Sequence, residues 1–250
     1  MSTRGTVRRF RWRDRVALVH ERGEGPARPT VLVHGIGVAR LYFTRLEAVL
    51  AATGPVITLE LPGFGRAPKR PGREAPPTIE EHALLVADVL RQRGGSGYRV
   101  VGHSMGTQIV ADLAARDPGL VGELALLGPV TDPAAPDALR QGLRLARDTL
   151  GEAPSTNAAV FTDYARTGPR WYLQTLPFML GYDLRAVLPR ITAPTVVMRG
   201  ARDPIAPHGW TEQVARLVPR SRFVEVPGAH HVLQFTHPER VAAELATGVP

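Results

Sequence analysis

The chain has 250 residues, a net charge of +8 and no cysteine. A chain of this length forms one large domain or two small ones, and it buries enough apolar surface to fold without a disulfide or a metal. The absence of cysteine excludes a disulfide scaffold, a thiolate metal site and a cysteine nucleophile. We find no apolar run typical of a signal peptide or a membrane span, so we expect a cytoplasmic protein with no membrane partner.

The positive charge comes almost entirely from arginine, because Lys69 is the only lysine. The arginines are scattered along the chain, apart from a small cluster before residue 16. No motif for nucleic-acid recognition accompanies them. The arginine bias is typical of a GC-rich coding sequence, and we expect no nucleic-acid partner.

Short apolar runs alternate with longer segments of helical periodicity, and this alternation predicts the fold class. Residues 7–21 are expected to form one or two antiparallel strands. In chain order, the pattern then predicts strand 30–34, helix 41–52, strand 55–61, helix 78–93, strand 98–103, helix 105–116, strand 122–128, strand 194–200, helix 208–217, strand 222–227 and helix 238–246. Thr78 and Glu81 form a capping box at the start of one helix. Such alternation predicts an α/β protein with a mainly parallel, twisted sheet flanked by helices.

Residues 131–190 interrupt this alternation. They contain no strand-like run, several prolines, and helical periodicity near 137–150, 157–167 and 171–180. We interpret residues 131–190 as a helical insertion that covers the sheet, and we assign 1–130 and 191–250 to the core.

A G-x-S-x-G motif lies at residues 102–106, with Ser104 at its centre. It follows a predicted strand and opens a predicted helix, which is the setting that a nucleophile elbow needs. There the glycines avoid collisions in a sharp turn, and the helix N-terminus points amide donors at an oxyanion. The alternative is an ordinary strand-to-helix turn capped by Ser104. We predict that Ser104 is a nucleophile.

A serine nucleophile needs a base and an orienting carboxylate. His230 and His231 follow the last predicted strand, and Asp203 follows the strand before it, so all would reach the same sheet edge as Ser104. We predict the order Ser104, Asp203, His231, with His230 as the alternative base. Asp132, after the strand at 122–128, is the alternative acid.

The developing oxyanion needs two hydrogen-bond donors. One is expected to be the amide of Met105, the residue after the nucleophile. The second should come from the loop after strand 30–34, and we assign it to the amide of Ile36.

Together these residues resemble the α/β-hydrolase superfamily over nearly the whole chain. The resemblance rests on the segments 34–37, 61–65, 102–106, 200–203 and 228–231, with Pro238 beyond them. Glu60 and Ala67 stand where the family has Asp and Ser in its second motif. The seven-residue spacing from His231 to Pro238 matches the family and favours His231 over His230 as the base. The insertion resembles the family's cap domain, whose apolar and aromatic residues would line an acyl or alcohol pocket.

The resemblance implies a serine hydrolase that cleaves a carboxylic ester, or a related acyl bond, through an acyl-enzyme on Ser104. It implies no metal and no organic cofactor, and a small-molecule substrate with an apolar portion. Fold alone does not fix the substrate. An acyltransferase or cyclase, a C–C bond hydrolase and a non-catalytic small-molecule receptor therefore remain alternatives. The oligomeric state cannot be read from the sequence.

Overall fold

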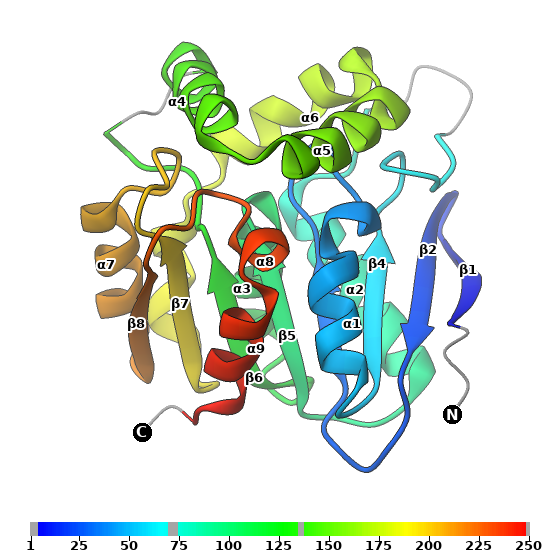
Figure 1. Ribbon diagram of the computed structural model, residues 1–250. Coiled ribbons are helices and arrows are strands. Elements are labelled where there is room, and N and C mark those ends of the chain that lie inside the picture. The colour runs from blue at the N-terminus through cyan, green and yellow to red at the C-terminus, as the bar shows by residue number, and fades with distance from the viewer. Residues whose placement is uncertain (1–4, 70–74, 135–137, 249–250) are drawn as a thin grey trace.

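The computed structural model describes residues 5–69, 75–134 and 138–248. Within these ranges the centre of the molecule is an eight-stranded sheet in the order β1-β2-β4-β3-β5-β6-β7-β8 (Figure 1). The pairs β1-β2 and β2-β4 are antiparallel, and all the other neighbouring pairs are parallel. The strands are β1 (Thr6–Trp12), β2 (Arg15–Arg22), β3 (Thr30–Val33), β4 (Val56–Glu60), β5 (Tyr98–His103), β6 (Val121–Leu127), β7 (Thr195–Gly200) and β8 (Ser221–Val226). The predicted mainly parallel sheet is confirmed.

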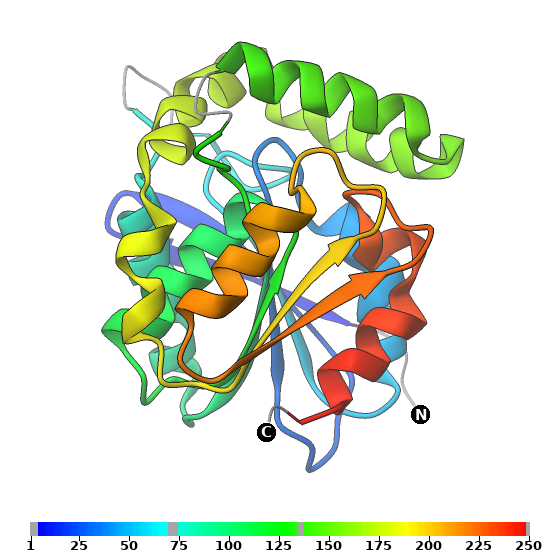
Figure 2. The same ribbon diagram turned by 90° about the vertical axis from the view of Figure 1, so that its left-hand side faces the viewer.

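Helices cover both faces of the sheet. On one face lie α1, α8 and α9, and on the other lie α2, α3 and α7 (Figures 1 and 2). These helices are α1 (Thr44–Ala51), α2 (Ile79–Arg93), α3 (Met105–Arg116), α7 (His208–Leu217), α8 (Leu233–Thr236) and α9 (Pro238–Ala246). Short 3-10 helices are η1 (Arg40–Phe43), η2 (Leu184–Ala186) and η3 (Leu188–Arg190). Thr78 and Glu81 form the predicted capping box of α2, each side chain accepting the other residue's amide.

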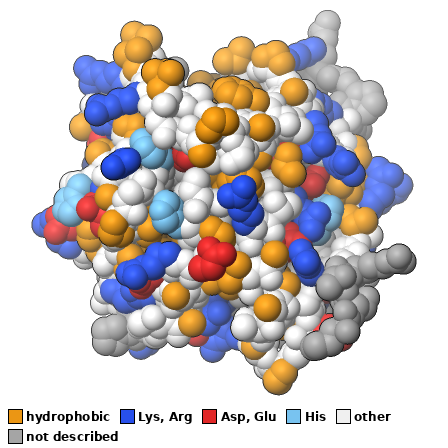
Figure 3. Space-filling model, in the orientation of Figure 1, with side chains coloured by type: hydrophobic (Ala, Val, Ile, Leu, Met, Phe, Trp, Pro, Cys, Tyr) orange, Lys and Arg blue, Asp and Glu red, His pale blue; other side chains and the backbone are white. Residues whose placement is uncertain are grey.

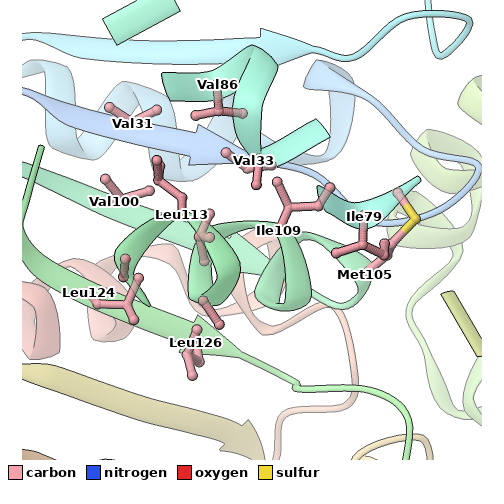
Figure 4. Packing of buried hydrophobic residues seen from close by; sticks show 14 of the residues in the cluster. Val31, Val33, Ile79, Val86, Val100, Met105, Ile109, Leu113, Leu124 and Leu126 are labelled. Atoms are coloured by element: carbon pink, nitrogen blue, oxygen red, sulfur yellow. The ribbon is translucent and has the colours of Figure 1, made fainter. Parts of the chain in front are cut away.

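The central strands are buried on both faces because successive side chains point to opposite sides. Val31 and Val33 belong to the core beneath α2 and α3, whereas Leu32 belongs to the core beneath α1 and α9. In Figure 4 the strand valines meet Ile109 and Leu113 of α3. Fixing α3 on the sheet in this way also fixes the residue that precedes it, Ser104.

Three further helices lie across the carboxyl ends of the parallel strands (Figures 1 and 2). They are α4 (Ala138–Gly151), α5 (Pro154–Thr167) and α6 (Pro169–Gly181). Helices were expected at 137–150, 157–167 and 171–180, and residue 137 lies outside the described residues. The division of the chain into a core (1–130 and 191–250) and an insertion (131–190) stays a prediction. The helices α4–α6 lie over the carboxyl edge of the sheet (Figures 1 and 2), which is the position expected of such an insertion.

Two details differ from the expected elements. The segment 41–52 begins as the 3-10 helix η1 and becomes α-helical only at Thr44. The short helix α8 was not expected, because four residues show no helical periodicity. No helix of the described chain is both long and apolar enough to cross a membrane.

The surface carries its arginines in a dispersed pattern. In Figure 3 blue side chains are spread over the visible face among red and orange ones, and hydrophobic side chains gather at the top, over α4–α6. Several large apolar side chains of these helices are exposed: Leu139, Leu143, Leu150, Phe161 and Leu173.

Candidate active site

Ser104 lies in the sharp turn between β5 and α3. Its backbone has φ 55° and ψ −124°, a region that non-glycine residues rarely occupy and that marks strain held by the surrounding structure. The Ser104 carbonyl accepts bonds from the Thr107 amide at 2.9 Å and from the Thr107 hydroxyl at 2.6 Å. The side chain of Ser104 is left to face the cavity described below.

Close backbone contacts explain the glycines around this turn. A Cβ atom at Gly102 would overlap the carbonyl oxygen of Gly106, and one at Gly106 would overlap that of Val33. A Cβ at Gly35 would lie 2.9 Å from Cβ of Ser104. The loop after β3 therefore packs directly on Ser104, and larger side chains would force the two loops apart.

His231 and Asp203 form a hydrogen-bonded pair. His231 Nδ1 lies 2.8 Å from Asp203 Oδ2, and the two side chains are 7% and 0% exposed. The other carboxylate oxygen of Asp203 accepts the amides of Ile205 at 2.8 Å and Ala206 at 3.0 Å. Because Asp203 Oδ2 accepts the bond from His231, Nδ1 of His231 carries the proton and Nε2 keeps its lone pair.

The charge of Asp203 also governs the protonation of His231. Burial by itself lowers the pKa of His231, but the adjacent Asp203 carboxylate, aided by Asp148 and Glu152, raises it above the usual value. A raised pKa makes the imidazole a stronger base while it stays neutral at moderately alkaline pH.

The alternative base and acid have other surroundings. His230 Nδ1 lies 3.6 Å from Asp148 Oδ1, and His230 is absent from the lining of the cavity that Ser104 and His231 share, as far as the described residues define it. Asp132 accepts the amide of Ala134 at 2.9 Å and pairs with Arg144 at 2.8 Å. The structure thus brings Asp203, rather than Asp132, to the imidazole of His231.

A directed chain of hydrogen bonds joins the three loops of the site. The Gly35 amide donates to the Tyr42 hydroxyl at 2.8 Å, and this hydroxyl lies 3.0 Å from His103 Nδ1. His103 Nε2 lies 2.9 Å from the carbonyl oxygen of His231. Because that carbonyl can only accept, Nε2 of His103 carries the proton, and Nδ1 accepts from Tyr42. Burial holds the pKa of His103 well below its usual value, which favours this neutral form.

His34 ties the end of β3 to the end of β4. Its Nε2 accepts the amide of Leu61 at 3.0 Å, and its Nδ1 donates to the carbonyl of Gly35 at 2.8 Å. Full burial lowers the pKa of His34 to about 4. Protonation of Nε2 would remove the acceptor for Leu61, so the folded state holds His34 neutral.

This burial predicts a loss of stability in mild acid that His34→Gln reduces. Between pH 6.5 and pH 4 the unfolded chain binds a proton at His34 and the folded chain does not, so the free energy of unfolding falls as pH falls. Titration of His34 contributes about 2 kcal/mol of this fall between pH 7 and pH 4.5. The glutamine amide oxygen can accept the Leu61 amide but does not titrate. Urea denaturation of both proteins at the two pH values measures the difference.

His82 provides an internal reference for that experiment. It is also fully buried, which lowers its pKa to about 3, and it titrates in the same direction in both proteins. Equal slopes of stability against pH in wild type and His34→Gln would contradict the assignment to His34.

The two expected oxyanion donors are the amide of Met105, next to Ser104 in the chain, and the amide of Ile36 in the loop after β3. Met105 is the first residue of α3, where an amide has no partner within the helix. Ile36 lines the same cavity as Ser104. The amide of Gly35, one residue before Ile36, already donates to the Tyr42 hydroxyl. The amide of Ile36 is therefore the next candidate in that loop for binding the oxyanion.

Ser104 and His231 open into a cavity of about 660 Å³ beneath α4–α6. Most of its wall is apolar or aromatic, with Leu145, Phe161, Tyr172, Leu176 and Met179 contributed by the covering helices. Among the described lining residues, the acidic side chains are Asp148 and Glu152, and there is no lysine or arginine. Within the described ranges, no group of three or more His, Asp or Glu side chains is placed to hold a metal ion.

The family model described as the alpha/beta hydrolase family matches residues 30–244. The chain belongs to the alpha/beta hydrolase family. It is an enzyme of this fold, and both the fold class and the expected resemblance are confirmed. The match includes every candidate residue named above, from the loop at His34 to His231.

Several relatives of this alpha/beta hydrolase are named as esterases. It is 31% identical to a pimeloyl-acyl-carrier-protein methyl ester esterase of Chromobacterium violaceum, covering 90% of this chain and 94% of the relative. A protein of the same name from Neisseria meningitidis is 29% identical, over 85% and 73% of the two chains. The structure of a thermophilic esterase from Thermogutta terrifontis has the same fold, with a TM-score of 0.74 and 24% identity over 93% of this chain and 92% of the other.

Proposed function

We propose that this protein hydrolyses a carboxylic ester, with Ser104 as nucleophile, His231 as general base and Asp203 as the orienting acid. The observation that carries this proposal is the 2.8 Å bond between His231 and Asp203, since His231 lines the same cavity as Ser104. The strained turn at Ser104 supports the same assignment, because such strain collects at reactive residues.

The reaction then takes place in two steps. His231 Nε2 removes the proton of Ser104 as the serine oxygen attacks the ester carbonyl, and the amides of Ile36 and Met105 bind the oxyanion. His231 returns the proton to the departing alcohol, which leaves an acyl group on Ser104. Water, deprotonated by His231, then attacks this acyl-enzyme. His231 returns that proton to the Ser104 oxygen as its bond to the acyl group breaks and the carboxylic acid leaves.

The cavity walls favour a small, uncharged substrate with an apolar portion. Leu145, Leu176 and Met179 supply apolar surface, whereas Asp148 and Glu152 would repel an anionic group. The relatives are named for a methyl ester of an acyl chain. We therefore propose, as the natural substrate class, methyl esters of medium-length carboxylic acids whose acyl chain carries no charged group. In this account the helices of residues 131–190 act as a cap that encloses the substrate.

A panel of p-nitrophenyl esters, from acetate to octanoate, tests this proposal. We expect turnover to rise with chain length until the cavity is filled. The p-nitrophenyl ester of hexanoate should be hydrolysed at least about tenfold faster than the p-nitrophenyl mono-ester of adipate. The free carboxylate of the adipate ester would approach Asp148 and Glu152 and be repelled by them. Labelling with a fluorophosphonate, followed by mass spectrometry of the labelled peptide, should locate the label on Ser104.

Two results would contradict the proposal. An absence of both turnover and labelling would favour a receptor on the same fold. A label on any other residue would remove Ser104 from its role. Equal rates for hexanoate and adipate esters would contradict the inferred charge preference alone.

A further inference from the structure

The last turn of α4 and the residue after it, Glu152, contact the loop that carries His231. Asp148 Oδ1 accepts the amide of His231 at 3.1 Å, and Glu152 Oε1 accepts the amide of Val232 at 3.0 Å. Between them, Gly151 packs so closely on His230 that a Cβ atom there would overlap the imidazole. Three residues of the segment 148–152 thus contact three consecutive residues of the loop, 230–232.

The two carboxylates that make these contacts are buried. Asp148 is 2% exposed and Glu152 is 8% exposed. A buried carboxylate needs hydrogen bonds to offset its lost hydration, and backbone amides supply them here. Acidic side chains that only keep a protein soluble remain exposed to solvent. Asp148 and Glu152 are instead buried against one loop, which indicates a role in holding that loop.

Hydrogen bonds from both the α/β core and the end of α4 occupy the polar groups of His231. The His231 amide donates to Asp148, the His231 carbonyl accepts from His103, and the imidazole bonds to Asp203. The next amide, of Val232, is bound by Glu152. Half of these restraints come from the covering helices and half from the α/β core.

We propose that Asp148 and Glu152 are positioning residues that hold the backbone of His231 and Val232, so that the imidazole keeps its alignment toward Ser104. This inference rests on the proposed role of His231 as the base. It makes the end of α4 part of the catalytic apparatus rather than only a wall of the pocket. An imidazole displaced by about 1 Å loses on the order of a hundredfold in rate.

The charge of Asp148 has a second effect, on protonation. Several titratable groups face it: His230 and His231 of the loop, Asp203 after β7, Glu152 beside it and Tyr164 of α5. Burial raises the pKa of Asp148 to about 6, and its carboxylate helps to raise the pKa of His231. Removing this charge while keeping an acceptor oxygen therefore lowers the pKa of His231.

The test compares Asp148→Leu with Asp148→Asn. The leucine variant removes the acceptor, and we expect kcat to fall about tenfold to a hundredfold with KM changed less than about threefold. The asparagine variant keeps an acceptor, so kcat should stay within about threefold of wild type. Its kcat/KM should nevertheless decline at a lower pH on the acid side. Glu152→Ala and Glu152→Gln form a second pair with the same expected difference in kcat.

Asp112→Leu is the matched control. Asp112 is also buried, on α3, but it binds Arg116 and Tyr182 instead of the loop. This variant should have a lower melting temperature and a kcat close to wild type at 25 °C. A fall in kcat equal to that of Asp148→Leu would overturn the inference, because it would reflect general destabilisation.

The remaining outcomes separate this inference from the proposed function. If Ser104 is labelled and Asp148→Leu keeps both its kcat and its rate of fluorophosphonate labelling, the positioning role is wrong and the hydrolase proposal stands. If Ser104 is never labelled, the proposed function itself fails. Should Asp148→Leu not fold, the Glu152 pair decides, since equal kcat values for Glu152→Ala and Glu152→Gln would contradict the positioning role.

Discussion

Ser104→Ala is expected to lower kcat by on the order of a millionfold, because the members of a catalytic triad act as a unit. Residual hydrolysis on the order of a thousandfold above the uncatalysed rate should persist, since the oxyanion donors and the cavity still bind the substrate. Steady-state kinetics on the fastest p-nitrophenyl ester, with single-turnover measurement for the variant, gives both values.

The control for this variant is Ser96→Ala. Ser96 is exposed at a bend before β5, so the same loss of a hydroxyl should leave kcat and the melting temperature unchanged. Ser104→Ala should also melt close to wild type, which separates loss of the nucleophile from loss of the fold. A kcat within tenfold of wild type for Ser104→Ala would remove the acyl-enzyme mechanism.

The second large effect concerns the adjacent histidines. His231→Gln should lower kcat by on the order of 10⁵ to 10⁶, whereas His230→Gln should lower it by less than about tenfold. The difference follows from the contacts, since His231 alone of the two pairs with Asp203. Kinetics of the two variants at pH 8 measure it, and a larger loss in His230→Gln would reverse the assignment.

The wild-type pH profile tests the same assignment by another route. Because Asp203 raises the pKa of His231 above its usual value, kcat/KM should fall on the acid side with a midpoint above about 6.5 as the base becomes protonated. A midpoint well below 6 would indicate that another group, or a differently surrounded histidine, acts as the base.

The placement of Ser104 could be predicted because the necessary information is local. The motif lies between a strand and a helix, and both glycines are required by backbone contacts within a few residues or with the adjacent strand. The edge on which Asp203 and His231 emerge was equally predictable, since every parallel strand ends there. The structure places Ser104 and His231 in the wall of one cavity, with the buried Asp203 bonded to His231.

Other parts of the site depend on contacts that no local pattern records. Asp148 and His231 are 83 positions apart in sequence, and Tyr42 and His103 are 61 apart. The sequence favours Asp203 but leaves Asp132 as an alternative acid, because each aspartate follows a strand. In the structure Asp203 bonds to His231, whereas Asp132 pairs with Arg144 of α4. Buried partners of this kind require the folded chain.

The covering helices leave and rejoin the core at adjacent strands. Residues before α4 extend from β6, residues after η3 lead into β7, and these two strands pair side by side from Leu124–Thr195 to Leu127–Met198. Because these strands are parallel, the chain leaves β6 at the carboxyl edge of the sheet and must return to the opposite edge to begin β7, and the segment with η2 and η3 makes this return (Figure 2). We expect that an exchange of α4–α6 that keeps this return segment would reshape the pocket without moving β7. It should preserve activity only where the new helices supply acceptors for the amides of residues 231 and 232.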